Sequence, residues 1–380
     1  MTAPLDLDDT AALEAGDPSG MLRDVASGAA QVREAAVLAR EAGVASLAES
    51  GRPRAVVVCG MGGSGIAGDV LAAVAGAGSP VPVVVHRGYG LPGWVGVADL
   101  VVAVSCSGST EETLSSLEEA VRRGVPLLVV GADGSPLHDL AQRGRAVFVP
   151  VTQGRQPRAS MWALSTPLVV AGAALGLCAG DDDVIEATAR ALEDVASRCR
   201  VDAEQIVNPA KHLAEHLLGA VPVIWGASPL TGTVAYRFAC QLNENAQVPA
   251  TWGVLPEAIH YQVVAFDGPF VSGRRAADPD GDDLFRDRAD DVETTGLALV
   301  LLRDTEEHPQ TARRADVSQR LAEDRGLPVH VLRAEGASAF ERLASLVGTI
   351  DFASTYVALA SGLDPTPVDA ITDLKQAISR

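Results

Sequence analysis

Residues Cys59 to Asp69 read CGMGGSGIAGD and directly follow a short apolar run, Ala55 to Cys59. Glycines at the end of a strand let backbone N–H groups approach an oxyanion, and the positive pole of the following helix adds to the attraction. A second loop, Ser105 to Thr113 with the sequence SCSGSTEET, follows the apolar run Leu100 to Ser105 in the same way. Its hydroxyl groups can hydrogen-bond the terminal oxygens of one phosphate without a metal ion or a lysine. The two loops together predict a monophosphate site at the ends of two strands.

The first loop also matches a dinucleotide-binding pattern, because Gly60, Gly62 and Gly65 satisfy GxGxxG. An NAD site requires an acidic residue about 20 residues further on, which binds the ribose. Ser79 to Gly90 contains no acidic residue and offers Arg87 instead. An NADP-dependent oxidoreductase that uses Arg87 is therefore the dinucleotide alternative, and a purely structural glycine turn is the other.

The second loop has an alternative interpretation as an ordinary helix cap. Ser109 with Glu112, or Thr110 with Thr113, has the spacing of an N-cap. Capping uses one or two hydroxyl groups and leaves the others free to face a ligand. Capping and phosphate binding are therefore compatible.

Val-rich runs of four to eight residues alternate with helical patterns along most of the chain, which is typical of buried parallel strands and their crossover helices. The expected strands are Ala55 to Cys59, Val81 to His86, Leu100 to Ser105, Pro126 to Val130, Ala146 to Val151, Val221 to Trp225, Leu297 to Arg303 and Pro328 to Arg333. The expected helices between them are Ser64 to Ala77, Thr110 to Arg123, Pro136 to Arg143, Thr231 to Asn243, Thr311 to Arg325 and Ala339 to Leu359, and a further helical stretch runs from Ala159 to Cys199. The alternation predicts an α/β protein with doubly wound, mainly parallel sheets and helices on both faces.

The two halves of the chain begin alike, since Trp225-Gly226-Ala227-Ser228 follows a strand as the first glycine loop does. We therefore expect two tandem α/β domains, at residues 51–205 and 206–380. Residues 1–50 form a helical lead-in, with one or two helices between Asp9 and Glu49. Ser272 to Asp291 is rich in Asp, Arg and Gly without apolar periodicity, and we expect a solvated loop there.

The composition limits the possible partners and compartment. With 30 basic and 49 acidic residues the net charge is −19, which opposes binding to nucleic acid, and there is no basic run to offset it. The five cysteines have no CxxC or metal-like spacing, as expected of reduced thiols in the cytoplasm. The N-terminus is acidic, unlike a secretory signal. The apolar stretch Pro167 to Ala179 is too short to cross a membrane and is expected to be buried.

Six segments in order resemble a known family, the bifunctional phosphoglucose/phosphomannose isomerases of the sugar isomerase (SIS) fold. The first two are the GMGGSG and SxSGxTEET loops. Gln156-Pro157-Arg158-Ala159 is similar to the PRA segment of the family, and Asn243-Glu244-Asn245-Ala246 is similar to its NEN segment. Pro256-Glu257 with His260 is similar to its PE…H segment. Asp364-Pro365-Thr366-Pro367-Val368 with Lys375 is similar to its C-terminal signature. The resemblance covers Gly60 to Lys375, nearly the whole chain.

The resemblance implies aldose–ketose isomerisation of glucose or mannose 6-phosphate and fructose 6-phosphate, with no metal and no cofactor. It implies that the phosphate is held by the hydroxyls of Ser64, Ser105, Ser107 and Thr110 and by the N–H groups of Gly62 and Gly63.

In the same resemblance four residues carry the chemistry. Glu244 moves the proton between C2 and C1, and Arg158 steadies the enediolate. His260, which comes from the neighbouring subunit of a homodimer, opens the sugar ring with help from Lys375. From the residues alone, Glu244 also has a simpler interpretation as part of a polar helix end, His260 as a structural histidine and Arg158 as a surface arginine.

Glu244 and Lys375 each have an argument apart from the family. A carboxylate at the end of the helix Thr233 to Leu242 faces the negative pole of the helix dipole, which disfavours its ionised form and suits a base. Lys375 is one of only two lysines beside 28 arginines, and a guanidinium does not replace a compact ammonium.

The chain departs from the familiar pattern at several positions that could reshape the sugar pocket. These are Tyr261 and Gln262, Met161 and Trp162, Val368, and the insertion Ser272 to Asp291. The competing class of function is a phosphosugar sensor without catalytic activity. Such a sensor usually carries an output module, and neither the charge nor the first 50 residues indicate one.

Overall fold

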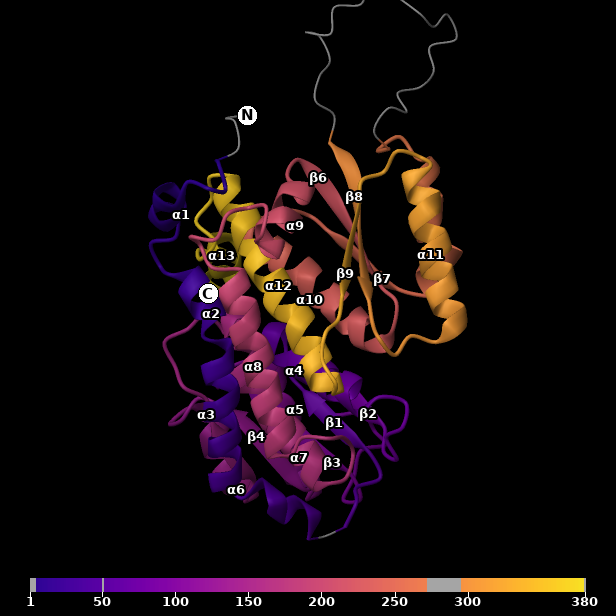
Figure 1. The fold of residues 1–380 in the computed structure, drawn as a ribbon. Coiled ribbons are helices and arrows are strands. Elements are labelled where there is room, and N and C mark those ends of the chain that lie inside the picture. Colours follow the sequence, from indigo (N-terminus) through magenta and orange to yellow (C-terminus); the bar gives the residue numbers. More distant parts are fainter. Residues whose placement is uncertain (1–4, 50, 272–294, 379–380) are drawn as a thin grey trace, which may run out of the picture. The chain divides into compact units, whose positions relative to one another are not determined.

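The computed structural model describes residues 5–49, 51–271 and 295–378 (Figure 1). The insertion Ser272 to Asp291 lies outside the described residues. The described chain forms two compact units, the first from residues 20–197 and 336–348 and the second from residues 5–19, 198–335 and 349–378. This division separates residues 5–19 from the other lead-in helices, so the expected boundaries at residues 50/51 and 205/206 stay a proposal about sequence order.

The first unit contains a sheet of five parallel strands in the order β2-β1-β3-β4-β5. The strands are β1 Val56–Cys59, β2 Val83–His86, β3 Leu100–Ser105, β4 Leu127–Gly131 and β5 Val147–Pro150. All five were expected from the sequence, because Val-rich runs buried on both faces are the mark of parallel strands. The central strands β1, β3 and β4 are buried along their whole length.

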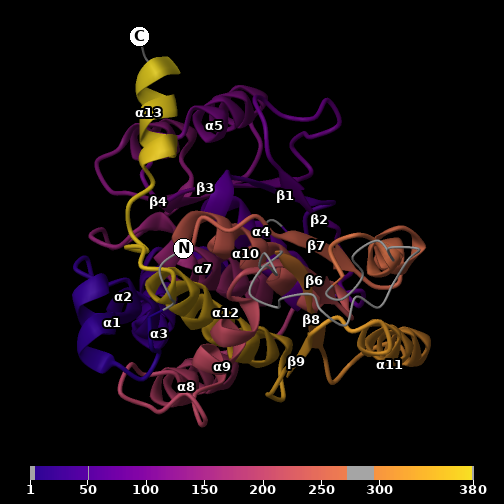
Figure 2. The ribbon, with the colours of Figure 1, turned by 90° about the horizontal axis from the view of Figure 1, so that it is seen from above.

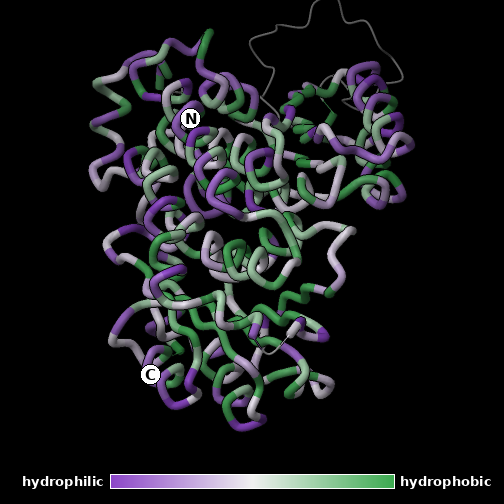
Figure 3. The backbone as a smooth tube through the Cα atoms, turned by 60° about the horizontal axis from the view of Figure 1, so that its bottom comes forward, coloured by the Kyte–Doolittle hydropathy of each residue, from purple (hydrophilic) through white to green (hydrophobic). Residues whose placement is uncertain are grey.

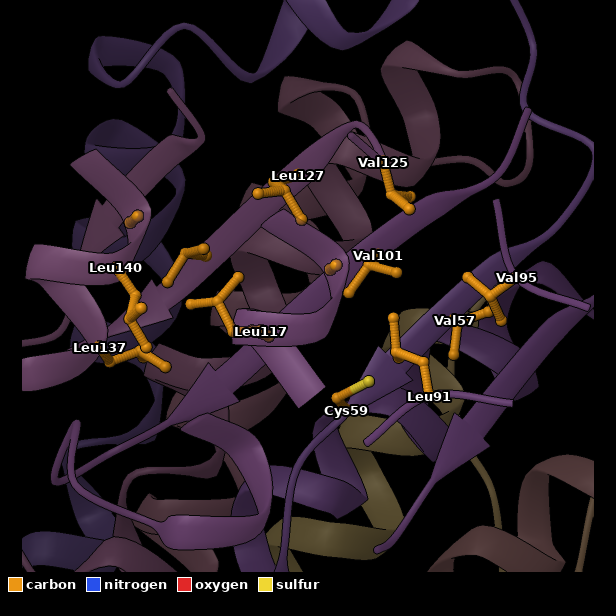
Figure 4. Close-up of a cluster of buried hydrophobic side chains, with 14 residues drawn as sticks. Val57, Cys59, Leu91, Val95, Val101, Leu117, Val125, Leu127, Leu137 and Leu140 are labelled. Atoms are coloured by element: carbon orange, nitrogen blue, oxygen red, sulfur yellow. The ribbon is translucent and has the colours of Figure 1, made fainter. Parts of the chain in front are cut away.

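Helices cover both faces of this sheet. On one face α5 (Glu111–Arg123) and α6 (Pro136–Gly144) pack on β1, β3 and β4 through a cluster that includes Leu117, Leu137, Val101 and Leu127 (Figure 4). On the other face lie α4 (Gly62–Ala75) and α7 (Met161–Ala174), with α3 (Gly28–Glu41) packed on α7. The doubly wound architecture expected for this half is confirmed.

The second unit contains a parallel sheet of four strands in the order β7-β6-β8-β9. The strands are β6 Ala220–Gly226, β7 Thr251–Val254, β8 Gly296–Arg303 and β9 Val329–Arg333. The sequence predicted all but β7. This four-residue edge strand has two exposed residues and a glycine, and so it lacks an apolar run.

The remaining helices complete the two units. They are α1 (Thr10–Gly16), α2 (Met21–Ala26), η1 (Val44–Ala48), η2 (Pro157–Ala159), α8 (Asp182–Arg198), α9 (Pro209–Leu217), α10 (Pro229–Asn245), η3 (Glu257–His260), η4 (Gln262–Asp267), α11 (Pro309–Glu323), α12 (Ala339–Ala360) and α13 (Asp369–Ile378). Residues 5–49 of the lead-in thus contain three α-helices rather than one or two, because the helical pattern is interrupted before Met21 and at Ser27. The sequence analysis missed α9, although Asn208 caps it and Pro209 occupies its first turn.

The helix α12 is long and apolar enough to cross a membrane by length and composition, and its apolar window is wholly buried inside the protein. It is longer than the apolar stretch Pro167 to Ala179 singled out in the sequence. Hydrophobic residues, green in Figure 3, run through the interior of the chain trace, and hydrophilic residues gather along outer turns. A linker carries α13 away from the end of α12 (Figure 2), and none of the residues of α13 is buried.

Candidate active site

The order of the first sheet decides where a ligand can bind. The strand order 2-1-3-4-5 reverses direction between β1 and β3, and in open α/β sheets ligands bind beyond the carboxyl ends of the strands at this switch point. The Cys59 to Asp69 loop follows β1 and the Ser105 to Thr113 loop follows β3, its neighbour in the sheet. The fold therefore brings together the two loops that the sequence singled out.

The first loop presents the beginning of α4. Gly62, the first residue of the helix, has φ +52°, a conformation that side chains rarely adopt. Met61 occupies the N-cap position without a side-chain hydrogen bond to the helix. Ser64 is buried, and its hydroxyl accepts a hydrogen bond of 3.2 Å from the N–H of Cys106 in the second loop. Ser64 therefore joins the two loops.

The second loop is organised by hydrogen bonds among its own hydroxyl groups. Ser105 Oγ lies 3.0 Å from Thr110 Oγ1 and accepts a bond from the N–H of Gly108. Ser107 Oγ accepts from both the N–H and the hydroxyl of Ser109. Thr110 stands at the N-cap of α5 but makes no side-chain cap bond. The hydroxyls thus bond one another rather than capping the helix, and Ser107 remains exposed.

Arg158 lies beside the first loop. It is 4% exposed, on the turn η2, and a Cβ placed on Gly63 would lie 3.8 Å from the Cα of Arg158. The same Cβ would lie 3.4 Å from the Pro157 carbonyl oxygen, which is van der Waals contact. The structure therefore places Arg158 in the same unit as the predicted phosphate ligands and against one of them.

Sequence reasoning missed a second arginine in this region. The Nε and Nη2 atoms of Arg155 are buried and, among the described residues, have no hydrogen-bond partner. Burial raises the pKa of the Cys106 thiol, and the positive charge of Arg155 acts in the opposite direction, which places that charge near the second loop. A buried guanidinium without partners is costly unless an anion pairs with it. The sequence offered one sign of this role for Arg155, which is its position three residues before Arg158.

Arg87, the basis of the NADP alternative, is paired with a carboxylate at the end of the first loop. It forms an ion pair with Asp69 on α4. Burial raises the pKa of Asp69, and the charge and hydrogen bond of Arg87 oppose that shift. The contact gives Arg87 a role in holding α4 to the loop after β2.

The second sheet has a corresponding loop, but a carboxylate already occupies it. Ser228 and Thr231 form a capping box at the start of α10. The hydroxyl of Ser228 also donates a 2.9 Å hydrogen bond to Asp304, which follows β8. The two halves therefore begin alike in sequence, but in the second half a carboxylate already accepts a hydrogen bond from the loop serine.

Glu244 lies in the last turn of α10 and is half-buried. The asparagines on either side of it are both anchored. Asn243 donates to the carbonyls of Ala239 and Val248, and Asn245 donates a 2.9 Å bond to Ser354 on α12. These bonds fix the end of the helix, and with it the backbone of Glu244.

A buried ion pair supports the same helix from within the second unit. Arg237 on α10 bonds both carboxylate oxygens of Asp351 on α12, at 2.9 and 2.6 Å, and Gln241 donates to one of them at 3.2 Å. Arg237, Gln241 and Asn245 recur every four residues, and so face the same neighbour. This polar ladder holds the helix that carries Glu244.

His260 and Lys375 also belong to the second unit, and both are exposed. His260 closes the turn η3, and no described residue pairs with its imidazole. Lys375 lies on α13, next to exposed apolar residues, of which Leu374 is 60% exposed. The structure thus places the phosphate loops and Arg158 in the first unit and Glu244, His260 and Lys375 in the second.

Two of the residues that depart from the family pattern, Gln262 and Trp162, have structural partners. Gln262 accepts a hydrogen bond from the indole of Trp225 on β6 and donates to the carbonyl of Trp252 on β7. Trp162 is buried, with its ring 5.8 Å from that of Phe340. These contacts give Gln262 and Trp162 a role in packing. Tyr261 is 55% exposed.

The sequence and the fold match known proteins. A SIS domain model matches residues 52–174, and a model of the bacterial phospho-glucose isomerase C-terminal SIS domain matches residues 206–378. A glucose-6-phosphate isomerase like protein from Thermus thermophilus has the same fold, with a TM-score of 0.60 and 18% identity over 98% of this chain and 99% of that one. The protein is thus a double SIS-domain protein of the phosphosugar isomerase class.

Curated relatives narrow the class further. A bifunctional phosphoglucose/phosphomannose isomerase from Caldicellulosiruptor bescii is 32% identical over 85% of this chain and 89% of its own length. One from Aquifex aeolicus is 29% identical over 86% of this chain and 91% of its own length. The chain belongs to the bifunctional phosphoglucose/phosphomannose isomerase family, as the six sequence segments predicted.

Proposed function

We propose that this protein interconverts glucose 6-phosphate and mannose 6-phosphate with fructose 6-phosphate. The observation that carries the proposal is the pair of serine- and glycine-rich loops, joined through Ser64, at the switch point of the first sheet. The family relatives supply the reaction class, which is that of an aldose–ketose isomerase.

The substrate phosphate binds to the hydroxyls of Ser64, Ser105, Ser107 and Thr110 and to the N–H groups of Gly62 and Gly63. Arg155 adds a positive charge, since its buried Nε and Nη2 atoms have no hydrogen-bond partner among the described residues. Preorganised donors of this kind cost no rearrangement when the charged substrate arrives. The sugar is then anchored at one end, with C1 and C2 left for the catalytic groups.

The reaction moves a proton between two adjacent carbons. In the direction from aldose to ketose, the Glu244 carboxylate takes the C2 proton and an enediolate forms. The O2 hydroxyl proton passes to O1, and the same carboxyl returns its proton to C1, so that C2 becomes the carbonyl carbon. Arg158 pairs with the negative enediolate oxygen. His260 and Lys375 transfer the proton that opens the sugar ring. No step consumes an oxidant or reductant.

The exposed position of His260 supports a homodimer, in which each subunit supplies its His260 to the site of the other. The five free cysteines, three of them buried, support a reducing compartment and hence the cytoplasm.

The phosphate site is tested by the double variant Ser64→Ala/Ser107→Ala. Each lost hydrogen bond to a charged group costs about 1.5–3 kcal/mol, so the affinity for fructose 6-phosphate should fall at least tenfold. Ser79→Ala is the matched control, because its hydroxyl bonds the carbonyl of Val81 before β2. Unchanged affinity in the double variant would leave the loops as structural turns. A coupled assay of the parent with all three sugar phosphates tests the reaction, and a protein that binds them without turnover is a sensor.

A further inference from the structure

The amino-terminal edge of the first sheet, opposite the phosphate loops, contains a cavity of about 520 Å³. It is lined by residues that come before β1, β3, β4 and β5, including Arg54, Ala98, Pro126 and Arg145. The loops that bind the phosphate follow the carboxyl ends of the same strands. In a parallel sheet the two ends of a strand cannot line one site, so this cavity is separate from the candidate active site. Its volume is within the range of small-molecule sites.

One wall of the cavity is held by a satisfied ion pair. Arg54 donates two hydrogen bonds to Asp99, of 2.9 and 2.6 Å, and a third to the carbonyl of Trp94. The N–H of Gly96 also donates to Asp99. The guanidinium of Arg54 holds the pKa of the Asp99 carboxyl below its usual range. The carboxylate is therefore neutralised within the wall and does not repel an anionic ligand.

Two further arginines at the same cavity have no such partner. Neither Arg52 nor Arg145 makes a side-chain hydrogen bond or ion pair with any described residue, although the protein carries 49 acidic residues against 30 basic ones. Arg145 is also held at φ +52°, the left-handed conformation that non-glycine residues rarely adopt. The cavity therefore combines a net positive charge with a fixed backbone at its rim.

The rest of the lining is mostly apolar, and includes Leu47, Val97, Leu127 and Leu175. We propose that this cavity binds a small organic anion, whose carboxylate or phosphate group pairs with Arg52 and Arg145 and whose apolar part lies against these side chains. Paired arginines favour planar or tetrahedral oxyanions. The proposal does not depend on the isomerase reaction, because the cavity shares no residue with the phosphate loops.

The probe for this site is 1-anilinonaphthalene-8-sulfonate, a fluorescent organic anion. Titration of the full chain should show one saturable site that a saturating concentration of fructose 6-phosphate does not displace. In Arg52→Ala/Arg145→Ala, affinity for the probe should fall about tenfold or more, as expected on the loss of two charged partners. The control, Arg313→Ala/Arg314→Ala, removes the same charge from the exposed side of α11 and should bind as the parent does.

A second variant distinguishes the contribution of the arginine charges to probe binding from that of the cavity volume. Val97 lines the cavity and is 71% exposed, so its replacement should not disturb the core. In Val97→Trp the larger side chain should fill the cavity and abolish binding of the probe. The uncharged analogue N-phenyl-1-naphthylamine should respond to Val97→Trp but change less than threefold in the double arginine variant. Displacement of the anionic probe by fructose 6-phosphate, or equal affinity in the two double arginine variants, would overturn the proposal.

Discussion

At the scale of single residues, Glu244, the base in the proposed reaction, lies between two asparagines that are hydrogen-bonded to other parts of the second unit. The amides of Asn243 and Asn245 fix the last turn of α10, while the carboxylate between them stays half-buried. The simpler alternative of a merely polar helix end would require no such anchoring on both sides. The anchoring is consistent with the proposed role of Glu244, and the following variant distinguishes a base from a polar helix end.

Replacement of Glu244 by glutamine tests this role directly. Glutamine keeps the size of the side chain but cannot accept the C2 proton, so turnover should fall by about 10² to 10⁴. The KM for fructose 6-phosphate should stay within a few-fold of that of the parent, because the phosphate loops are intact. Steady-state kinetics, together with exchange of the C2 hydrogen in deuterated solvent, measures both. Undiminished exchange in the variant would exclude Glu244 as the base.

At the scale of elements, the pair α10 and α12 depends on the buried ion pair of Arg237 and Asp351. Both side chains are almost completely buried, at 2% and 6% exposure. Loss of one partner removes the bidentate pair from the other buried charge, and such a break costs about 3–5 kcal/mol. Replacement of both partners by apolar residues removes that cost.

Asp351→Asn should therefore lower the free energy of unfolding by about 3–5 kcal/mol, measured by urea denaturation with circular dichroism. Arg237→Met/Asp351→Leu should be less destabilised than the single variant, since no charge is left unpaired. If the double variant is the less stable of the two, the helices are joined mainly by the charges themselves.

At the scale of the whole molecule, a group of three histidines makes folding sensitive to acid. His212 and His216 lie on α9, and their rings are 5.3 and 5.4 Å from that of His330 on β9. Burial, reinforced by the charges of His216 and His212, lowers the pKa of His330 to about 4. Burial also lowers the pKa of His216, against a hydrogen bond to the Leu299 backbone.

The sign of the effect follows from these directions. In the unfolded chain a histidine has a pKa near 6.5, so below that pH the unfolded state binds more protons than the folded state. The contribution of His330 to the free energy of unfolding is therefore fully present above about pH 6.5. It is lost as the pH drops toward 4, by up to about 1.4 kcal/mol per pH unit. Urea unfolding between pH 7.5 and 4.5 should show a shallower decline in His330→Gln than in the parent. Identical slopes would show that His330 does not contribute.

The proposed sharing of His260 between subunits makes a prediction about mixtures. Glu244→Gln and His260→Asn should each be nearly inactive alone. After the two are unfolded and refolded together, half of the sites in each mixed dimer combine Glu244 of one subunit with His260 of the other. Activity should then return to roughly a quarter of that of the parent, as random pairing requires. Absence of recovery, with mixed dimers present by mass spectrometry, would place His260 in its own subunit.

The sequence determined most of the fold by itself. Continuous apolar runs and period-3.6 patterns both report burial directly. The Val-rich strands and the helices between them were therefore predicted closely, from the first strand, Ala55 to Cys59, to the last, Pro328 to Arg333. The edge strand β7 and the helix α9 escaped, because a short, half-exposed strand has no apolar run and a nine-residue helix has little periodicity. The loop motifs and the six segments also sufficed to predict the family.

Only the tertiary structure decided which side chains do what. Thr110 is the N-cap residue of α5, yet its hydroxyl lies 3.0 Å from that of Ser105. The two are close because the loop that contains Thr110 begins at Ser105, the last residue of β3. Arg155 looked like one arginine among many until burial left its guanidinium without a described partner. Arg52 and Arg145 are 93 positions apart in the chain and meet at one cavity only because parallel strands align their amino-terminal ends. Local patterns record burial, whereas pairing between distant residues depends on how the strands are ordered.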